Sequence, residues 1–337
     1  MVRALRACAL TLVACNPAAT TAPPAPLLPA APAKPPGPPR PVALPAVAVT
    51  IDDLVVGGRD LPDERLQDMT AGILRHITAG GVPVVGFVNS AKLGEGVQRQ
   101  ARIRLLRQWT DAGVELGNHT HSHPSLQDTP LADYEADVLR GEPEIRALDA
   151  EHGWPLRYFR HPYLRTGPTL AVRDAFEQFL AEHHYTVAPV TIDNSDWLFN
   201  LVYSDARSRG DAALMARVGV AFITYMGEVL TFHEQATDRL MGRQIRHILL
   251  LHANELNADH LDEVIALYRE RGYSFISLAD ALADDAYQQP DRYAGPAGVS
   301  WLYRWEFTRG QKQIDWTAEP KIPEFVQTAY DAAQRAD

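Results

Sequence analysis

Hydrophobic and polar positions alternate in two different ways along the chain from residue 47 onward. Short apolar runs predict strands at 47–51, 82–88, 114–116, 158–159, 185–192, 247–251 and 275–278. Between them, apolar residues recur every three or four positions, most clearly over 102–109, 131–148, 169–180, 211–230 and 261–268, which predicts helices. This repeated alternation indicates an α/β fold with a mostly parallel sheet, either closed into a barrel or open and doubly wound.

Polar residues follow the predicted strands at the point where each strand ends. They are Asp52-Asp53, Asn89, His119, Arg160-His161, the stretch 193–197 and His252. In a parallel α/β barrel the carboxyl ends of the strands share one face, and that face carries the active site. The sequence therefore predicts that these residues meet at one site.

The residues before 47 have a different composition. The segment 1–14 has Arg3 and Arg6 followed by a short apolar run, which is typical of a secretory signal and too short for a transmembrane helix. It ends in Leu-Val-Ala-Cys, which resembles a bacterial lipobox and predicts lipidation of Cys15; the alternative is an ordinary signal peptide that is cleaved further on. Residues 15–46 are rich in proline and alanine, and we expect an extended tether.

Charge and composition narrow the class of partner. The formal net charge is −10 and the sequence has no basic patch, so nucleic acid is an unfavourable partner. No obligate protein partner is evident.

The segment at about 198–246 is long for one crossover and is interpreted as an insertion. The extension 286–337 contains Trp301, Tyr303, Trp305, Phe307 and Trp316, which either cap the barrel or offer stacking faces for sugars.

Three side chains form a candidate metal site. His119 and His123 are four residues apart, so they can point to one side of a helical turn and hold one ion. With Asp53 they leave a fourth position open, as in hydrolytic zinc sites. The adjacent Asp52 can face the same pocket if the backbone turns there, and it would then take a proton from water. His121 is expected to point away.

Five short motifs resemble those of the polysaccharide deacetylases with a NodB homology domain, carbohydrate esterase family 4. In chain order they are Thr50-Ile51-Asp52-Asp53, His119-Thr120-His121-Ser122-His123-Pro124, Arg160-His161-Pro162-Tyr163, Asp193-Asn194-Ser195-Asp196-Trp197 and Leu250-Leu251-His252. The resemblance covers roughly residues 47–280, and the domain that it predicts spans 47–285. It implies a distorted (β/α)7-type, TIM-like barrel with the aromatic extension added to it.

The resemblance also implies roles for individual residues. Asp53, His119 and His123 would bind the metal ion, which would be zinc, with cobalt, nickel or iron as alternatives. Asp52 would be the general base oriented by Arg160, and His252 the general acid paired with Asp196. The residues expected to contact substrate are Tyr163, Trp197, Leu250 and His161.

The leading hypothesis is a metal-dependent hydrolase that removes acetyl groups from an acetylated polysaccharide, with an N-acetylglucosamine glycan favoured. The alternatives are an O-acetyl esterase of the acetylxylan type, a small-amide hydrolase, and a glycan-binding module with a vestigial site. The lipobox predicts a cell-envelope lipoprotein held at a membrane by its lipid, at the outer membrane or facing the periplasm of a Gram-negative bacterium.

Overall fold

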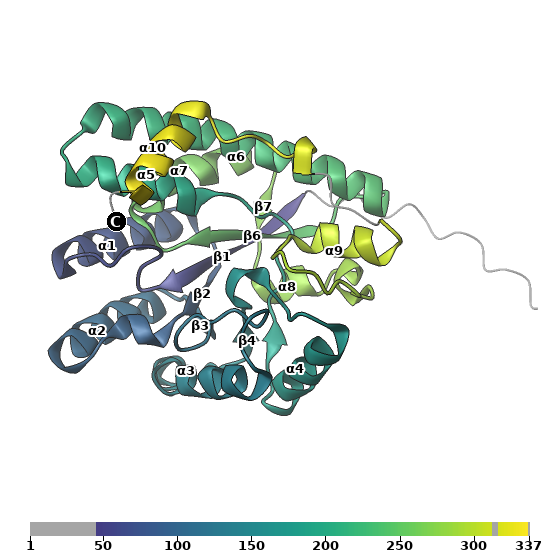
Figure 1. Ribbon diagram of the computed structural model, residues 1–337. Coiled ribbons are helices and arrows are strands. Elements are labelled where there is room, and N and C mark those ends of the chain that lie inside the picture. Colours follow the sequence, from purple (N-terminus) through teal and green to yellow (C-terminus); the bar gives the residue numbers. More distant parts are fainter. Residues whose placement is uncertain (1–44, 312–315, 336–337) are drawn as a thin grey trace, which may run out of the picture. The chain divides into compact units, whose positions relative to one another are not determined.

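Seven parallel strands form one curled sheet at the centre of the protein (Figure 1). They are β1 (Ala46–Leu54), β2 (Val84–Val88), β3 (Glu115–Asn118), β4 (Tyr158–Phe159), β5 (Thr186–Val187), β6 (Arg246–His252) and β7 (Ser274–Phe275). Their order is β5-β4-β3-β2-β1-β6, and β7 pairs with the start of β1. This computed structural model describes residues 45–311 and 316–335, so the predicted signal, the tether before residue 45 and Cys15 lie outside the described residues.

The two edges of the sheet are joined by one stretch of chain, residues 186–192. At its start, the Ala188 amide donates to the Phe159 carbonyl of β4 at 2.8 Å. At its end, the Leu250 amide of β6 donates to the Ile192 carbonyl at 3.1 Å. The stretch that begins as the edge strand β5 therefore also reaches β6 at the other end of the order, and the sheet curls into a distorted barrel. The predicted α/β class and barrel are confirmed.

Helices cover the outside of the sheet. They are α1 (Asp63–Gly80), α2 (Gly96–Asp111), α3 (Leu131–Glu151), α4 (Leu170–Glu182), α5 (Asp196–Ser208), α6 (Ala212–Met241), α7 (Glu255–Glu270), α8 (Leu278–Leu282), α9 (Trp301–Thr308) and α10 (Glu324–Arg335). Four 3-10 turns complete the set: η1 (Ser90–Leu93), η2 (Pro162–Leu164), η3 (Asp285–Gln288) and η4 (Trp316–Ala318).

Two predicted strands are shorter than expected, for local reasons. Of 185–192 only Thr186–Val187 is strand, because the chain leaves β4 beyond Ala188 to reach β6 and Pro189 has no amide hydrogen to donate. The prediction of strand through Leu278 is wrong, because Leu278 begins α8. There the Ser277 hydroxyl accepts a hydrogen bond from the Asp280 amide at 3.1 Å, which caps the helix.

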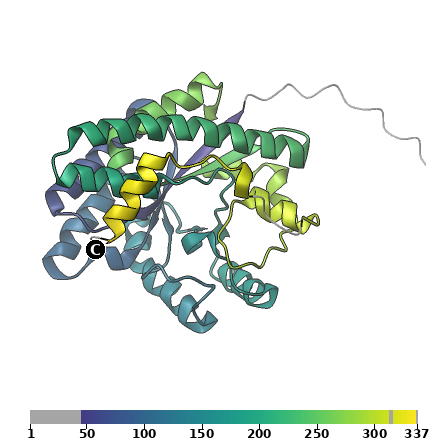
Figure 2. The same ribbon diagram turned by 45° about the horizontal axis from the view of Figure 1, so that its top comes forward.

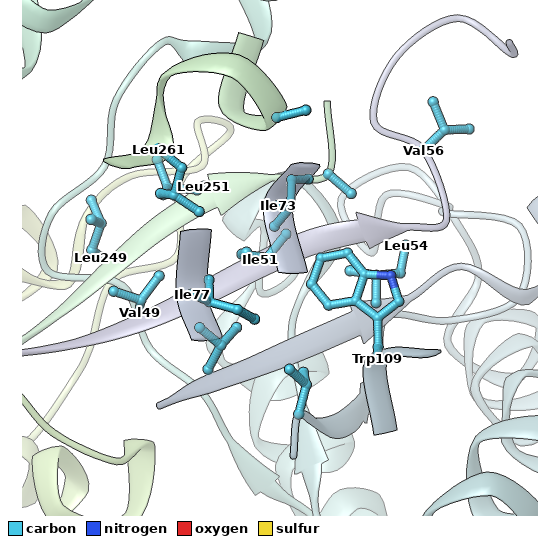
Figure 3. Packing of buried hydrophobic residues seen from close by; sticks show 14 of the residues in the cluster. Val49, Ile51, Leu54, Val56, Ile73, Ile77, Trp109, Leu249, Leu251 and Leu261 are labelled. Atoms are coloured by element: carbon cyan, nitrogen blue, oxygen red, sulfur yellow. The ribbon is translucent and has the colours of Figure 1, made fainter. Parts of the chain in front are cut away.

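Alternate residues of the strands fill two different spaces. Val49 and Ile51 of β1, with Leu249 and Leu251 of β6, face α1 and α7 in the main core (Figure 3). The intervening residues point inside the curl, where Ala48, Phe87 and Ile248 belong to a separate small cluster. Because side chains alternate along a strand, Thr50 and Asp52 follow Ala48 on this inner side and reach the carboxyl end of the barrel.

The C-terminal extension packs against the barrel. Trp301, Tyr303 and Trp305 are all buried, and the Trp301 amide donates to the Val190 carbonyl at 2.7 Å. The capping interpretation therefore holds for these three residues, whereas Phe307 is partly exposed and the Trp316 side chain lies outside the described residues. Figure 2 shows this yellow segment running from α9 beside α6 to α10, which contacts α5.

The segment predicted as an insertion forms two consecutive helices, α5 and α6. Within the described ranges, α6 is the one helix whose length and apolar composition would allow it to cross a membrane. It contacts α5, α7 and α9 and buries residues such as Phe222, Met226 and Leu230, which is how the core helix of a folded domain also packs. Its composition is therefore accounted for by this packing.

A buried carboxyl group in the fold predicts an effect of pH on stability. Asp149 of α3 accepts a hydrogen bond from the Leu116 amide at 3.0 Å, and burial raises its pKa to about 7. The folded state thus binds more protons than the unfolded state between pH 4 and 7, and stability falls as pH rises through that range. Asp149→Asn keeps the acceptor without the charge, so we expect it to raise the free energy of unfolding at pH 8 by on the order of 1–3 kcal/mol, with no gain at pH 4.

Urea unfolding at pH 4, 6 and 8 measures this effect. Asp111→Asn is the matched control, because Asp111 is an exposed aspartate at the end of α2. If Asp149→Asn and the wild type lost stability in parallel between pH 4 and 8, Asp149 would not be the titrating group.

Candidate active site

A cleft of about 740 Å³ lies at the carboxyl ends of the strands. Asp52 and Asp53 of β1, His119 after β3, the stretch 193–195 and His252 at the end of β6 all line it. The polar residues that follow separate strands in the sequence are therefore neighbours in space, as the sequence predicts.

Asp52 and Asp53 both face this cleft because the backbone of β1 is irregular there. The pairing of β1 with β2 shifts register between Ile51 and Leu54, and Asp53 has φ of 65°, in the left-handed region. This bulge cancels the alternation that would send adjacent side chains to opposite faces. The predicted turn of the backbone is present, although it lies within the strand and not beyond its end.

His119 and His123 converge with Asp53. The two Nε2 atoms are 3.2 Å apart, and Asp53 Oδ1 lies 3.7 Å from the first and 3.6 Å from the second. The expected helical turn is wrong: residues 119–123 form a loop. Asp137 of α3 holds that loop by accepting hydrogen bonds from the amides of His121 and Ser122, at 3.0 and 2.8 Å.

These three side chains fit a divalent metal ion. His119 Nδ1 donates to the Arg160 carbonyl at 2.8 Å, so its Nε2 carries a lone pair. Burial lowers the pKa of both His119 and His123, which keeps the imidazoles neutral. Asp53 Oδ1 is buried and has no hydrogen-bond partner within the described residues. Ligand atoms about 2.0–2.1 Å from a tetrahedral ion are about 3.4 Å apart, close to the spacing seen here.

Asp52 lies beside this ligand set and close to Arg160. Arg160 Nη1 lies 3.3 Å from Asp52 Oδ2, and its Nη2 donates to the Thr50 hydroxyl at 2.8 Å. Burial raises the pKa of Asp52 to about 6, and the Arg160 charge opposes a larger rise. The other oxygen, Oδ1, is buried without a hydrogen-bond partner in the described part of the chain. Arg160 therefore holds one carboxylate oxygen of Asp52, Oδ2, and the other, Oδ1, has no hydrogen-bond partner among the described residues.

His252 and Asp196 form a hydrogen-bonded pair next to Asp52, because His252 of β6 is the residue directly paired with Asp52 of β1. His252 Nδ1 donates to Asp196 Oδ1 at 2.6 Å. Burial alone would lower the pKa of His252, but the Asp196 carboxylate outweighs it and raises the pKa to about 10. The side-chain Nδ2 groups of Asn254 and Asn257 donate hydrogen bonds to Asp196 Oδ2 at 3.1 and 2.7 Å, which fixes the carboxylate.

The residues predicted to contact substrate differ in exposure. Tyr163 and Trp197 are exposed at 55% and 49%, and Leu250 is buried but lines the cleft. The Tyr163 ring lies 4.4 Å from the His123 ring, between centroids. His161 also lines the cleft, although it is buried and its ring packs edge-on against Phe159 and Phe176. His121 hydrogen bonds to Ser90 at 2.8 Å and is no part of the metal-ligand set.

Sequence reasoning missed three contributors to the site. Lys92 of η1 donates to the Val56 carbonyl at 2.6 Å, and its charge helps lower the pKa of Asp53. Asn254 follows His252 by two positions, so its place beside the fifth motif was a usable signal. Ala297 and Gly298 of the extension line the cleft, and no local pattern in the sequence indicates this.

Residues 40–187 match the family model described as polysaccharide deacetylase. The match spans 148 of the 337 residues, and over this range the chain is similar to the polysaccharide deacetylase family. The matched range contains the first three motifs, and the geometry above adds the fourth and fifth to the same cleft. The resemblance that the motifs predict is thereby confirmed over residues 40–187.

Similar proteins include a peptidoglycan-N-acetylglucosamine deacetylase of Bacillus cereus, which is 23% identical over 232 residues. That alignment covers 69% of this chain and 66% of the relative, about two thirds of its length. Solved structures of similar fold include the chitin deacetylase of the fungal pathogen Colletotrichum lindemuthianum, at 20% identity and TM-score 0.47, covering 76% of this chain and 95% of that one. A family 4 carbohydrate esterase pseudoenzyme from Bacillus anthracis has 16% identity, TM-score 0.44, and coverage of 72% and 66%.

Proposed function

We propose that this protein is a metal-dependent deacetylase that removes acetyl groups from an acetylated polysaccharide, preferably one that contains N-acetylglucosamine. The observation that carries the proposal is the placement of two different proton-transfer groups in one cleft. Asp52 lies beside the three candidate metal ligands, and His252, which is hydrogen bonded to Asp196, lines the cleft on the neighbouring strand β6. A vestigial glycan-binding module would have no need for this complete set.

Asp53, His119 and His123 would hold the metal ion, and zinc suits two imidazoles and one carboxylate, with cobalt, nickel or iron as alternatives. When bound, such an ion supplies Lewis acidity, which lowers the pKa of a water and polarises an acyl oxygen. The burial of Asp53 Oδ1 without a partner in the described residues supports this role, because an unpaired buried carboxylate oxygen is costly.

Asp52 would take the proton from the attacking water. A base works best when its pKa is near the working pH, and the pKa of about 6 for Asp52 meets this condition. Arg160 is a positioning residue: its hydrogen bonds to Thr50 and its approach to Asp52 hold one carboxylate oxygen in place, so that the other faces the cleft.

His252 would protonate the leaving group, which is an amine nitrogen in N-deacetylation and an alkoxide oxygen in O-deacetylation. Its Nδ1 is used by Asp196, so Nε2 is the atom that can donate. The raised pKa of His252 keeps the imidazole protonated at neutral pH, as a general acid requires. Leu250 and Trp197 offer an apolar wall for the acetyl methyl group.

The substrate class is tested by acetate release from the purified full chain loaded with zinc. N-acetylglucosamine oligomers and acetylated xylan are assayed side by side, with the metal-stripped protein as blank. We expect acetate release from the oligomers, and we expect this release to require the metal. The choice of substrate follows the name of the Bacillus cereus relative. Release from xylan alone would identify an O-acetyl esterase, and release from neither, with metal bound, would contradict the proposal.

We further propose that the protein works in the cell envelope as a lipoprotein attached through Cys15. The support is the lipobox-like sequence that ends at Cys15 and the proline-rich segment after it. A tether of that kind lets an enzyme reach a polymer while its lipid stays in the membrane. Cys15→Ser should release the protein from the membrane fraction; retention there would contradict this assignment.

A further inference from the structure

Trp197 stands at the boundary between the catalytic cleft and a second, much smaller cavity. It follows Asp196 in the first turn of α5, and it is 49% exposed. It lines the cleft and also a cavity of about 30 Å³ between the turn after β1 and α5, which we call the rear cavity. Gly57, Gly58 and Asn254 line both spaces as well. The position of the Trp197 indole therefore sets how far the cleft extends on this side.

A residue of the C-terminal extension contacts the Trp197 ring. The Tyr330 ring of α10 lies edge-on to it, with 5.9 Å between the centroids and 77° between the planes. Aromatic pairs prefer this arrangement. Among the described residues, no other aromatic ring contacts Trp197, and none forms a hydrogen bond with its side chain. The indole is therefore held by packing, and Tyr330 supplies the aromatic part of that packing.

Helix α10 is itself fixed near both of its ends, so it can hold Tyr330 in place. Near its end, the Ala333 carbonyl accepts a hydrogen bond from Arg59 Nη2 at 3.0 Å, and Arg59 also lines the rear cavity. Near its start, Arg217 Cζ of α6 lies 4.1 Å from the centroid of the Phe325 ring. Between these two points the helix contacts α5, which carries Trp197 (Figure 1).

The place of the Trp197 ring matters for the acyl group of the substrate. The proposed function puts the acetyl methyl group against Leu250 and Trp197, so a longer acyl chain would collide with the indole. An indole that tilted into the rear cavity would add up to about 30 Å³ to the cleft. This is about the share of one water molecule, which suits one more methylene group. One methylene group in an apolar pocket changes selectivity by about 10–200-fold.

We propose that Tyr330 is a positioning residue that keeps the Trp197 ring out of the rear cavity, so that the cleft excludes acyl groups longer than acetyl. The inference rests on the proposed function and adds the determinant of its acyl specificity. It gives the C-terminal extension, which lies outside the range that resembles the deacetylase family, a part in substrate selection. Tyr330 needs only its ring for this role, because its hydroxyl accepts a hydrogen bond from Gln334 Nε2 at 2.6 Å within α10 itself.

The test is the binding of two tetrasaccharides to the zinc-loaded full chain carrying Asp52→Asn, measured by isothermal titration calorimetry. One is the N-acetylglucosamine tetramer, and the other is its N-propionyl counterpart, which has one more methylene in each acyl group. With Tyr330 present, we expect the acetyl tetramer to bind at least ~10-fold more tightly. Tyr330→Ala should bring this ratio close to one, whereas Tyr330→Phe keeps the ring and should preserve the ratio.

Thr328→Ala is the matched control, because Thr328 is an exposed residue of the same helix and lines neither the cleft nor the rear cavity. It should leave the ratio unchanged. An unchanged ratio in Tyr330→Ala, even with both tetramers bound more weakly, would overturn the proposal, and so would loss of the ratio in Tyr330→Phe. Equal binding of the two tetramers with Tyr330 present, or binding of neither, would overturn it as well. The readout needs no turnover, so selective binding without acetate release in the assay above would contradict the proposed function alone.

Discussion

Asp52→Asn is expected to lower the rate of acetate release by about 10²–10⁴-fold, the usual contribution of a general base. Asparagine keeps the shape of the side chain and an oxygen near Arg160, but it cannot accept the proton of the attacking water. The candidate metal ligands are unchanged, so the metal content should stay equal to that of the wild type. The measurement pairs acetate release with metal analysis of the same sample.

Asp68→Asn, an exposed change on α1, controls for the substitution itself and should leave the rate unaltered. Wild-type turnover by Asp52→Asn would show that another group accepts the proton. Loss of metal together with activity would show instead that Asp52 belongs to the ligand set, where its Oδ2 already lies 3.8 Å from His119 Nε2.

His119→Ala should abolish metal binding and activity together. Its Nε2 is one of three candidate ligand atoms, and changes that only disturb the support of a ligand already weaken metal affinity ~10–100-fold. Losing the ligand itself should cost at least as much. Competition with a chelating dye measures the affinity, and circular dichroism checks that the variant folds.

His121→Ala is a stringent control for this prediction, because it removes a histidine two positions away in the same loop. His121 points to Ser90, so its loss should leave the stoichiometry of one ion per chain intact. If His121→Ala lost the metal while His119→Ala retained it, the assignment of ligands within the loop would be reversed.

The parts of the fold that follow local pattern could be predicted from the sequence. Seven apolar runs correspond to seven strands because buried parallel strands are nearly continuous in apolar residues. The proximity of Asp53 and His119 was predictable because both lie at the carboxyl ends of strands, which parallel topology brings to one face. The five motifs strengthened this by resemblance.

Other features depend on contacts between distant residues or on backbone conformation. The loop of His119 and His123 has a spacing that also suits a helix, and contacts with distant residues such as Asp137 of α3 hold it as a loop. The wall formed by Gly298 is unpredictable for the same reason: it packs against the Tyr163 carbonyl, so closely that an added Cβ would lie 1.6 Å from that oxygen. Neither contact leaves a periodic signal.

The direction of β1 has a practical consequence. The strand begins at Ala46 and carries Asp52 and Asp53 near its other end, so at ~3.3 Å per residue these two residues lie about 20–23 Å from the point where the strand begins. A resin or sensor surface coupled at Ala46 would therefore meet the barrel at the end opposite the cleft. Immobilised protein should then keep its cleft open to long, insoluble glycans.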